Sequence, residues 1–120
     1  RENIELFGGW EKIMISAYEV NEKDWKLFRN KIAGWQDAYI DKLNKEYINL
    51  LSSDEKPSIK FWALEKRIRN DKNDAGVVVE MKRSKLIDNI AALLDESAIT
   101  MDDLEEFSDE FKERVRFFAG

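Results

Sequence analysis

The chain has 120 residues, of which 43% are hydrophobic and 38% are charged, and its formal net charge is −5. It contains no histidine and no cysteine, so it lacks both the side chain that titrates near neutral pH and the thiol that serves as nucleophile and soft metal ligand. This composition excludes a disulfide framework and the usual zinc sites. We therefore expect a protein that is not an enzyme and uses no cofactor.

The length and the scarcity of turn residues predict one helical domain. A chain of this length buries roughly two-thirds of its unfolded surface, which is enough to fold without disulfides or metals. With only five glycines and one proline, helices are favoured. We predict a single compact helical domain over residues 1–120, all-α in class and built from five to six helices. Its apolar runs are short of the roughly 18 residues that cross a bilayer, and no signal-peptide pattern is present, so we expect a cytoplasmic protein without a membrane partner.

The first segment with a helical pattern covers residues 10–18, and a short helix is our first interpretation. Because β-branched Ile13 and Ile15 alternate within it, a strand over 13–15 stays open as the alternative. Its partner would be the valine run at 77–79, which gives one short two-stranded patch of 13–15 with 77–79. An extended but unpaired segment at 77–79 is equally compatible with the sequence.

An apolar stripe with steps of three and four residues runs from Trp25 to Leu50. Asn21 precedes the stripe as the predicted N-cap, and Asp24 lies in the first turn. The stripe keeps its register through Gly34, which predicts one long or merely kinked helix, since a true break would let the register drift. A helix of roughly 30 residues would be about 45 Å long, so we expect either a bend near this glycine or a protruding end.

A polar connector over residues 52–57 separates this helix from a second one, predicted over 58–72. Phe61 and Trp62 share a side of that helix with other apolar residues, so we predict that they lie in the core, as for the other tryptophans on apolar stripes. The helix should end shortly before Gly76, which would take the left-handed conformation that closes helices.

Two further helices complete the predicted fold. Paired apolar residues one turn apart indicate a helix from about residue 84 to 95. Thr100 and Asp103 then have the spacing of a capping box, and the apolar stripe over 104–118 predicts a last helix. Ser108 is placed to cap a second piece within that helix.

Residues 93–104, with the sequence Leu-Leu-Asp-Glu-Ser-Ala-Ile-Thr-Met-Asp-Asp-Leu, resemble the helix, tight turn, Ile-Thr cap and helix of SHOCT-type helical hairpins in bacterial proteins. The local resemblance extends over residues 86–118. Ser97 and Ala98 stand where those hairpins have a turn glycine. The resemblance implies a helical hairpin at this end of the chain.

Four other segments are similar to a family of short, uncharacterised all-helical proteins from Firmicutes. They are Glu11-Lys12-Ile13, Phe61-Trp62, Arg67-Ile68-Arg69 and Met81-Lys82-Arg83-Ser84. This second resemblance implies a bacterial origin and a helical fold, and it brings no catalytic residues with it.

Two short patterns look like chemical motifs but fail on spacing or context. Ser53 and Lys56 match the Ser-x-x-Lys pattern of penicillin-recognising enzymes, but the partner motifs are missing and the chain is too short for that fold. The turn before Asp103 ends like a calcium loop, yet counting back places Ala92 and Leu94 at ligand positions, and neither can ligate. We therefore predict no catalytic, cofactor-binding or metal-binding residue.

Charge is distributed unevenly along the chain. Residues 1–55 hold 8 basic and 11 acidic side chains (net −3), residues 56–85 hold 9 and 4 (net +5), and residues 86–120 hold 3 and 10 (net −7). The basic residues either face the acidic last helix within the molecule or contact a partner. The residues that we predict to carry a contact all belong to the basic segment: Lys66, Arg67, Arg69, Lys72, Lys82, Arg83 and Lys85.

These observations predict a non-catalytic bacterial protein-interaction or regulatory module that presents a helical, charge-segregated surface. Its partner would be a protein. A second copy of the chain, in a homodimer, is one such partner, because a protruding helix leaves part of its apolar stripe uncovered. One alternative is a nucleic-acid-binding accessory protein that uses the basic segment 56–85 and its aromatic neighbours. Another is an acidic inhibitor whose C-terminal segment imitates a phosphate backbone.

Overall fold

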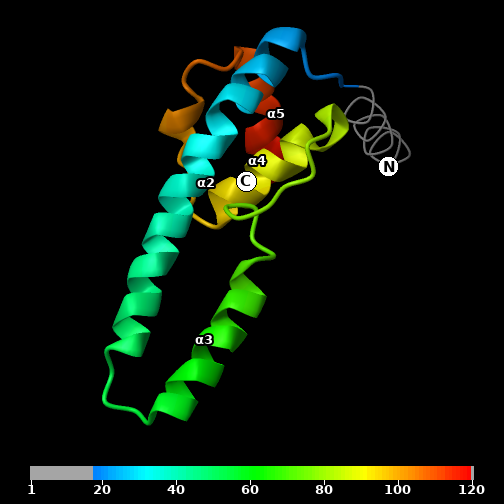
Figure 1. Cartoon of the computed structure of the whole chain (residues 1–120). Helices are drawn as coiled ribbons and strands as arrows, with labels where there is room; N and C mark the ends of the chain where they lie inside the picture. Colours follow the sequence, from blue (N-terminus) through cyan, green and yellow to red (C-terminus); the bar gives the residue numbers. More distant parts are fainter. Residues whose placement is uncertain (1–17, 120) are drawn as a thin grey trace, which may run out of the picture.

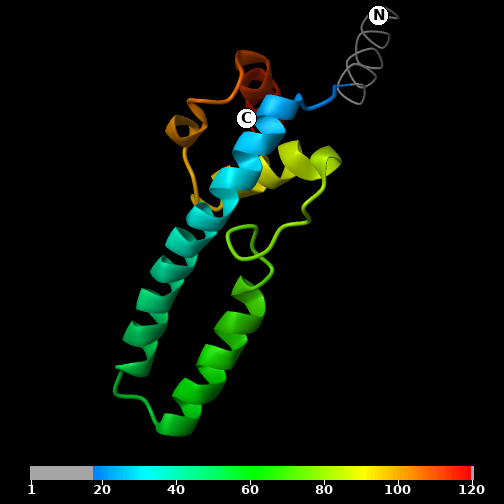
Figure 2. The same cartoon turned by 45° about the horizontal axis from the view of Figure 1, so that its top comes forward.

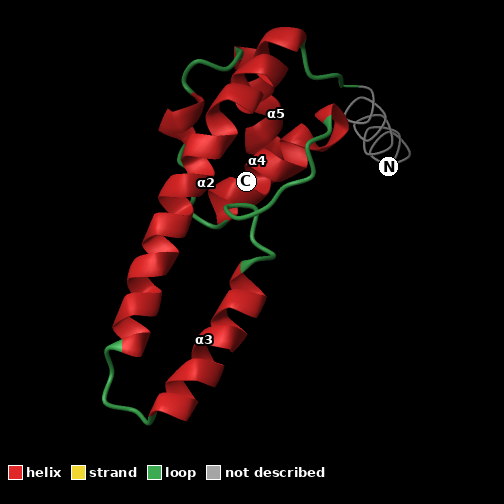
Figure 3. Cartoon of the chain, viewed as in Figure 1, coloured by secondary structure: helices red, strands yellow, loops and turns green. Residues whose placement is uncertain are grey.

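The computed structural model describes residues 18–119, which form helices joined by loops (Figure 1). The all-α class is confirmed for this part of the chain, where no residue is in a strand (Figure 3). The expectation of five to six helices is not confirmed by these residues. They form four α-helices and two short 3-10 helices, namely α2 (Glu22–Leu51), α3 (Pro57–Asp71), η1 (Arg83–Lys85), α4 (Leu86–Asp95), η2 (Met101–Leu104) and α5 (Asp109–Ala119).

The predicted two-stranded patch is not confirmed. The helix expected over 10–18 and the strand expected over 13–15 lie outside the described residues, except that Tyr18 is not helical. At 77–79 the chain forms the end of a turn and then irregular structure. The backbone N–H groups of Val77 and Val78 both donate to the carbonyl oxygen of Asp74, at 2.9 Å. Residues 74–78 therefore form a turn and not an extended segment.

The long helix is confirmed, and its start follows the capping pattern. The side chain of Asn21 accepts a hydrogen bond from the backbone N–H of Asp24 at 2.8 Å, and acidic Glu22 and Asp24 occupy the first turn. The helix continues through Gly34 without interruption to Leu51. Preserved register in the sequence thus corresponds to one continuous element.

The molecule is elongated because α2 is longer than the packed part of the protein. Its principal extents are 62 × 36 × 22 Å. The first half of α2 packs with α4 and α5, and the second half extends away from them beside α3 (Figures 1 and 2). We call residues 39–72 the hairpin and the other described residues the body. Of the two expected outcomes for α2, the protruding end is the one observed.

The hydrophobic core lies in the body, where the first half of α2 meets α4, η2 and α5. Trp25 and Trp35 are half-buried against this core, as the apolar stripe predicted. The stripes of these elements converge because their apolar residues recur at helical spacing. The fully buried side chains of the core are Phe28, Leu86, Ile90, Leu93, Leu104, Phe111 and Val115.

The predicted last helix is divided into two pieces. The capping box is confirmed, since the backbone N–H of Thr100 donates to the carboxylate of Asp103 at 2.8 Å. It opens only a 3-10 turn, however, and the chain then leaves the helical path before α5. The hydroxyl of Ser108 accepts from the backbone N–H of Phe111 at 3.2 Å, so Ser108 caps α5 as predicted. The stripe over 104–118 thus belongs to two pieces, which the predicted cap at Ser108 allowed, and Phe118 is exposed.

The turn after α4 has the geometry that normally requires glycine. Ser97 has a φ of 60°, in the left-handed region. The N–H of Ala98 donates to the carbonyl of Leu93 at 2.9 Å, and that of Ser97 donates to the carbonyl of Leu94 at 3.0 Å. This pair of bonds is the Schellman arrangement that ends a helix. The serine thus occupies the position where a turn glycine is typical.

Gly76, in contrast, does not have the expected left-handed backbone, because no described glycine has a positive φ. Close packing is the reason for the glycine. A Cβ at this position would lie 2.2 Å from Cδ2 of the Tyr39 ring. The hydroxyl of the same tyrosine donates to Asp74 at 2.7 Å, which holds the ring in place. A side chain at 76 is therefore excluded by the tyrosine.

The predicted core positions of Phe61 and Trp62 are wrong. Their exposed fractions are 61% and 63%, and no residue of α3 is buried. The physical reason is that α3 packs beside the second half of α2 and turns Lys60, Arg67 and Asp71 toward it, not these two aromatic residues. In the part of the chain that the structure describes, no helix is both long and apolar enough to span a bilayer.

Candidate interaction surface

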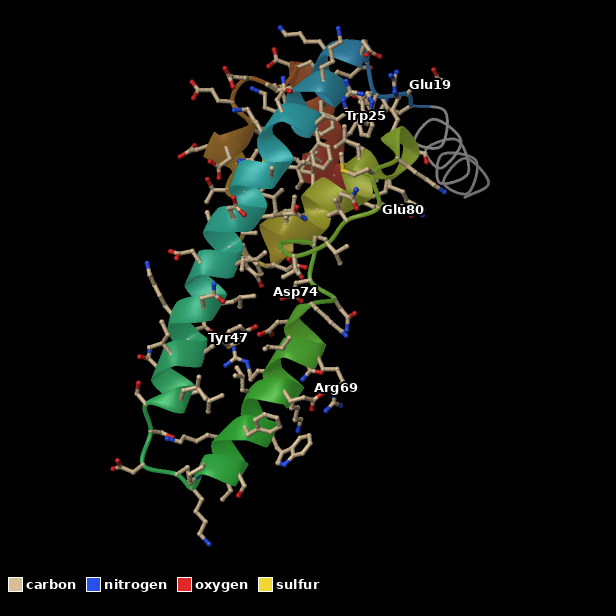
Figure 4. The ribbon with its side chains drawn as sticks, viewed as in Figure 1. Glu19, Trp25, Tyr47, Arg69, Asp74 and Glu80 are labelled. Carbon is tan, nitrogen blue, oxygen red and sulfur yellow. The ribbon has the colours of Figure 1, made fainter. Side chains whose placement is uncertain are left out.

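Polar side chains hold the two helices of the hairpin together. The hydroxyl of Tyr47 donates to Asp71 at 2.6 Å, and the guanidinium of Arg67 donates to Glu46 at 2.7 Å. The same guanidinium lies 5.5 Å from the centre of the Tyr47 ring. At the tip, the Lys60 ammonium donates to the carbonyl oxygens of Leu51, at the end of α2, and of Ser53 in the connector. These bonds fix which side of α3 is turned toward α2 (Figure 4).

Burial and the hydrogen bond to Asp71 raise the pKa of the Tyr47 phenol to about 12. Burial and the bond to Asp74 likewise raise the pKa of Tyr39. Both tyrosines therefore stay neutral donors to carboxylates of α3 and the loop behind it. The protonated phenol of Tyr47 thus bonds α2 to α3, and that of Tyr39 bonds α2 to the loop after α3.

We expect the hairpin to weaken at alkaline pH. In the unfolded chain Tyr47 ionises near pH 10, so the stability that it contributes is complete below pH 10 and is lost as the pH rises through 12. Urea unfolding between pH 8 and pH 11.5, values that bracket the usual phenol pKa, should give a falling free energy of unfolding. Tyr47→Phe should make this fall shallower, and an unchanged slope would contradict the assignment.

One side of the hairpin is apolar on both helices. Successive helical residues are rotated by about 100°, so Phe61 and Ile68 each follow an inward-facing basic residue of α3 by one such step. On α2, Ile40 and Ile48 follow the inward-facing Tyr39 and Tyr47 in the same way. In two adjacent antiparallel helices, the residues that follow the facing residues by one position lie on the same side of the helix pair. We call this side the apolar face, and it comprises Ile40, Ile48, Leu51, Phe61, Leu64 and Ile68.

Four of the six residues of the apolar face are exposed, and Ile40 and Leu64 are half-buried. The exposed fractions are 61% for Ile48, 45% for Leu51 and 43% for Ile68. A shallow groove of about 280 Å³ runs along α3 and is lined by apolar residues together with Glu65, Arg69 and Lys72. Clustered apolar residues of this kind, rimmed by charge, are typical of contact sites on proteins rather than of ordinary surface.

The predicted basic residues fall into two groups. Four lie on α3 or just after it, whereas Lys82, Arg83 and Lys85 lie at η1 beside the body (Figure 1). The loop between Arg69 and Glu80 separates the two groups in Figure 4. The structure thus brings together Lys66, Arg67, Arg69 and Lys72 on the hairpin, but not the whole set.

Several of these basic side chains already have partners within the molecule. Arg67 turns inward to Glu46, and Arg69 bonds Glu65 at 2.6 Å. At η1, Arg83 pairs with Glu22 and lies 5.9 Å from the Trp25 ring centre, while Lys82 pairs with a glutamate two residues before it. None of these partners belongs to the acidic last helix. Lys66, Lys72 and Lys85 form no ion pair among the described residues.

Sequence reasoning missed the apolar face itself. The sequence did not indicate that polar Lys60, Arg67 and Asp71 form the side of α3 that faces α2. Once these three residues face α2, the apolar residues beside them must face solvent.

A larger cavity of about 620 Å³ lies in the body, and Tyr18, Arg83, Asp88 and Arg114 are among its lining residues. Its charges are mixed, with acidic and basic side chains on its rim. Among the described residues, no group of three or more carboxylates is placed to hold a metal ion.

Comparison with protein-family models, with curated proteins and with solved structures gave no match to this chain.

Proposed function

We propose that this protein is a non-catalytic protein-interaction module whose contact element is the hairpin. The observation that carries the proposal is that α3 holds no buried residue, while large apolar side chains of both helices share one solvent-exposed side. Residues that stay exposed gain none of the stabilisation that burial of apolar surface gives, and a cluster of large exposed apolar side chains is typical of a surface that a partner covers.

Charge supports the same element as the contact. Residues 39–72 hold 8 basic and 6 acidic side chains, a net charge of +2, so the remainder of the chain holds 12 and 19, a net charge of −7. The hairpin is therefore a basic and apolar extension of an acidic body. A long-range field of this kind directs partners toward one end of the molecule.

A photo-crosslinking experiment tests the proposal. Benzoylphenylalanine replaces Phe61 on the apolar face, and in a matched variant it replaces Asn49, an exposed residue on the opposite side of the hairpin. After irradiation of cells of the source organism, we expect covalent adducts at position 61 and few at position 49. Mass spectrometry then identifies the attached chain.

Adducts to any protein, including a second copy of this chain, that form at position 61 alone support the interaction function. Equal adduct formation at both positions, or none at either, contradicts it. The two variants expose the same photoreactive group on the same element, so a difference between them reports the side of the hairpin.

A further inference from the structure

We infer that the apolar face is covered by a second copy of this chain, packed face to face so that the two hairpins form a four-helix bundle. This inference rests on the proposed function, because it names the partner of the same surface. A two-helix layer that is apolar on one side buries that side most simply against an identical layer.

The dimensions of the hairpin are suited to such a bundle. α3 has 15 residues, and a helix of that length is about 22 Å long. Two adjacent helices, each about 10 Å wide, then offer a footprint of roughly 20 × 22 Å. This footprint of about 440 Å² is about half of the roughly 800 Å² that each partner buries in a standard stable interface. We therefore expect a dimer that dissociates on dilution.

Charge determines the orientation of the two copies. In a parallel arrangement the two acidic bodies would lie side by side, and their like charges would repel. In an antiparallel arrangement each hairpin, with net charge +2, points toward the other copy's body, and the two bodies, each with a net charge of −6, are kept at opposite ends. We therefore place a twofold axis across the middle of α3, near Leu64, so that each Leu64 lies close to its counterpart.

Sedimentation velocity of the purified protein tests the association. Between about 1 and 100 µM, a range in which exchangeable dimers populate both states, we expect a shift from monomer to dimer. Phe61→Glu with Ile68→Glu should weaken the dimer at least tenfold. Asn49→Glu with Asn70→Glu adds the same charge on the opposite side of the hairpin and should leave the strength of the dimer unchanged. All four positions are exposed, and circular dichroism checks that the helices are retained.

The absence of cysteine from the chain permits a test of orientation. Under mild oxidation, Leu64→Cys should form a disulfide-linked dimer, whereas Asn49→Cys should not, because only facing residues at the axis approach closely enough. Linkage at Asn49→Cys but not at Leu64→Cys would overturn the antiparallel face-to-face arrangement.

Two results would overturn the second copy as occupant: a monomer throughout the concentration range, or a dimer that both pairs of glutamate substitutions leave unchanged. If the chain is monomeric and Phe61 crosslinks to a different protein, the interaction function stands and only the self-association fails. If neither adducts nor dimers form, both proposals fail.

Discussion

Asp24→Ala is expected to lower the free energy of unfolding by about 3 to 5 kcal/mol, because it removes two hydrogen bonds to a buried charged group. The carboxylate of Asp24 is fully buried. It accepts from the backbone N–H of Ser108 at 2.9 Å and from its hydroxyl at 2.6 Å. These bonds place the carboxylate at the N-terminus of α5, where the helix dipole favours a negative charge. The substitution would leave the start of α5 without its partner on α2.

Glu22→Ala is the matched control, because it removes the same charge from the same turn of α2. Its carboxylate is exposed and, within residues 18–119, forms an ion pair with Arg83 alone, so we expect a loss below about 1 kcal/mol. Urea unfolding of both variants and of Ser108→Ala measures the difference. The double variant Asp24→Ala with Ser108→Ala should lose less than the sum of the single changes, since both remove the bond from the Ser108 hydroxyl to Asp24. Equal losses for Asp24→Ala and Glu22→Ala would refute this role.

The elements that the sequence predicted well are those specified by residues close together in the chain. The stripe from Trp25 to Leu50 and the Asn21 cap are local patterns, and α2 follows both. The capping box at Thr100 is local in the same sense. Helical periodicity, however, carries no information on which helix is covered.

The errors concern contacts between distant parts of the chain. The sequence indicated the cap at Ser108 but not the bond between this residue and Asp24, which is 84 residues away. The exposure of Phe61 and Trp62 follows from the polar contacts of Arg67 and Tyr47 across the hairpin. Neither relation has a signature within a short window of sequence.

The candidate surface was predicted only in part. The basic charge of residues 56–85 directed attention to α3, and Lys66 and Lys72 are exposed there. Counting charge along the chain could not separate the hairpin group from the η1 group, because the loop between them carries few acidic residues. It also could not identify Ile48 as a neighbour on the same surface, since that requires the antiparallel pairing of two helices.

Gly76 and Gly34 should respond to alanine with opposite signs. At position 76 a Cβ would lie 2.2 to 2.7 Å from three carbons of the Tyr39 ring, and the ring is buried and held by Asp74. Overpacking of this kind costs about 1 to 3 kcal/mol. At position 34 nothing lies within 4 Å of the added methyl group, and alanine favours the middle of a helix by up to about 1 kcal/mol.

The loop that holds Gly76 also joins the hairpin to the body, so its displacement should have a second effect. The carboxylate of Glu96 accepts from the backbone N–H groups of Ala75 and Gly76 at 2.8 and 3.0 Å, and Gln36 donates to the carbonyl of Ala75 at 3.0 Å. A shift of this loop in Gly76→Ala would loosen all of these bonds, and hydrogen exchange at 75 and 76 should rise together with the loss of stability measured in urea.

Replacing Tyr39 by alanine removes the obstructing ring, so Gly76→Ala in that background should cost little. A full penalty in the absence of the ring would show that the backbone, and not the tyrosine, requires the glycine.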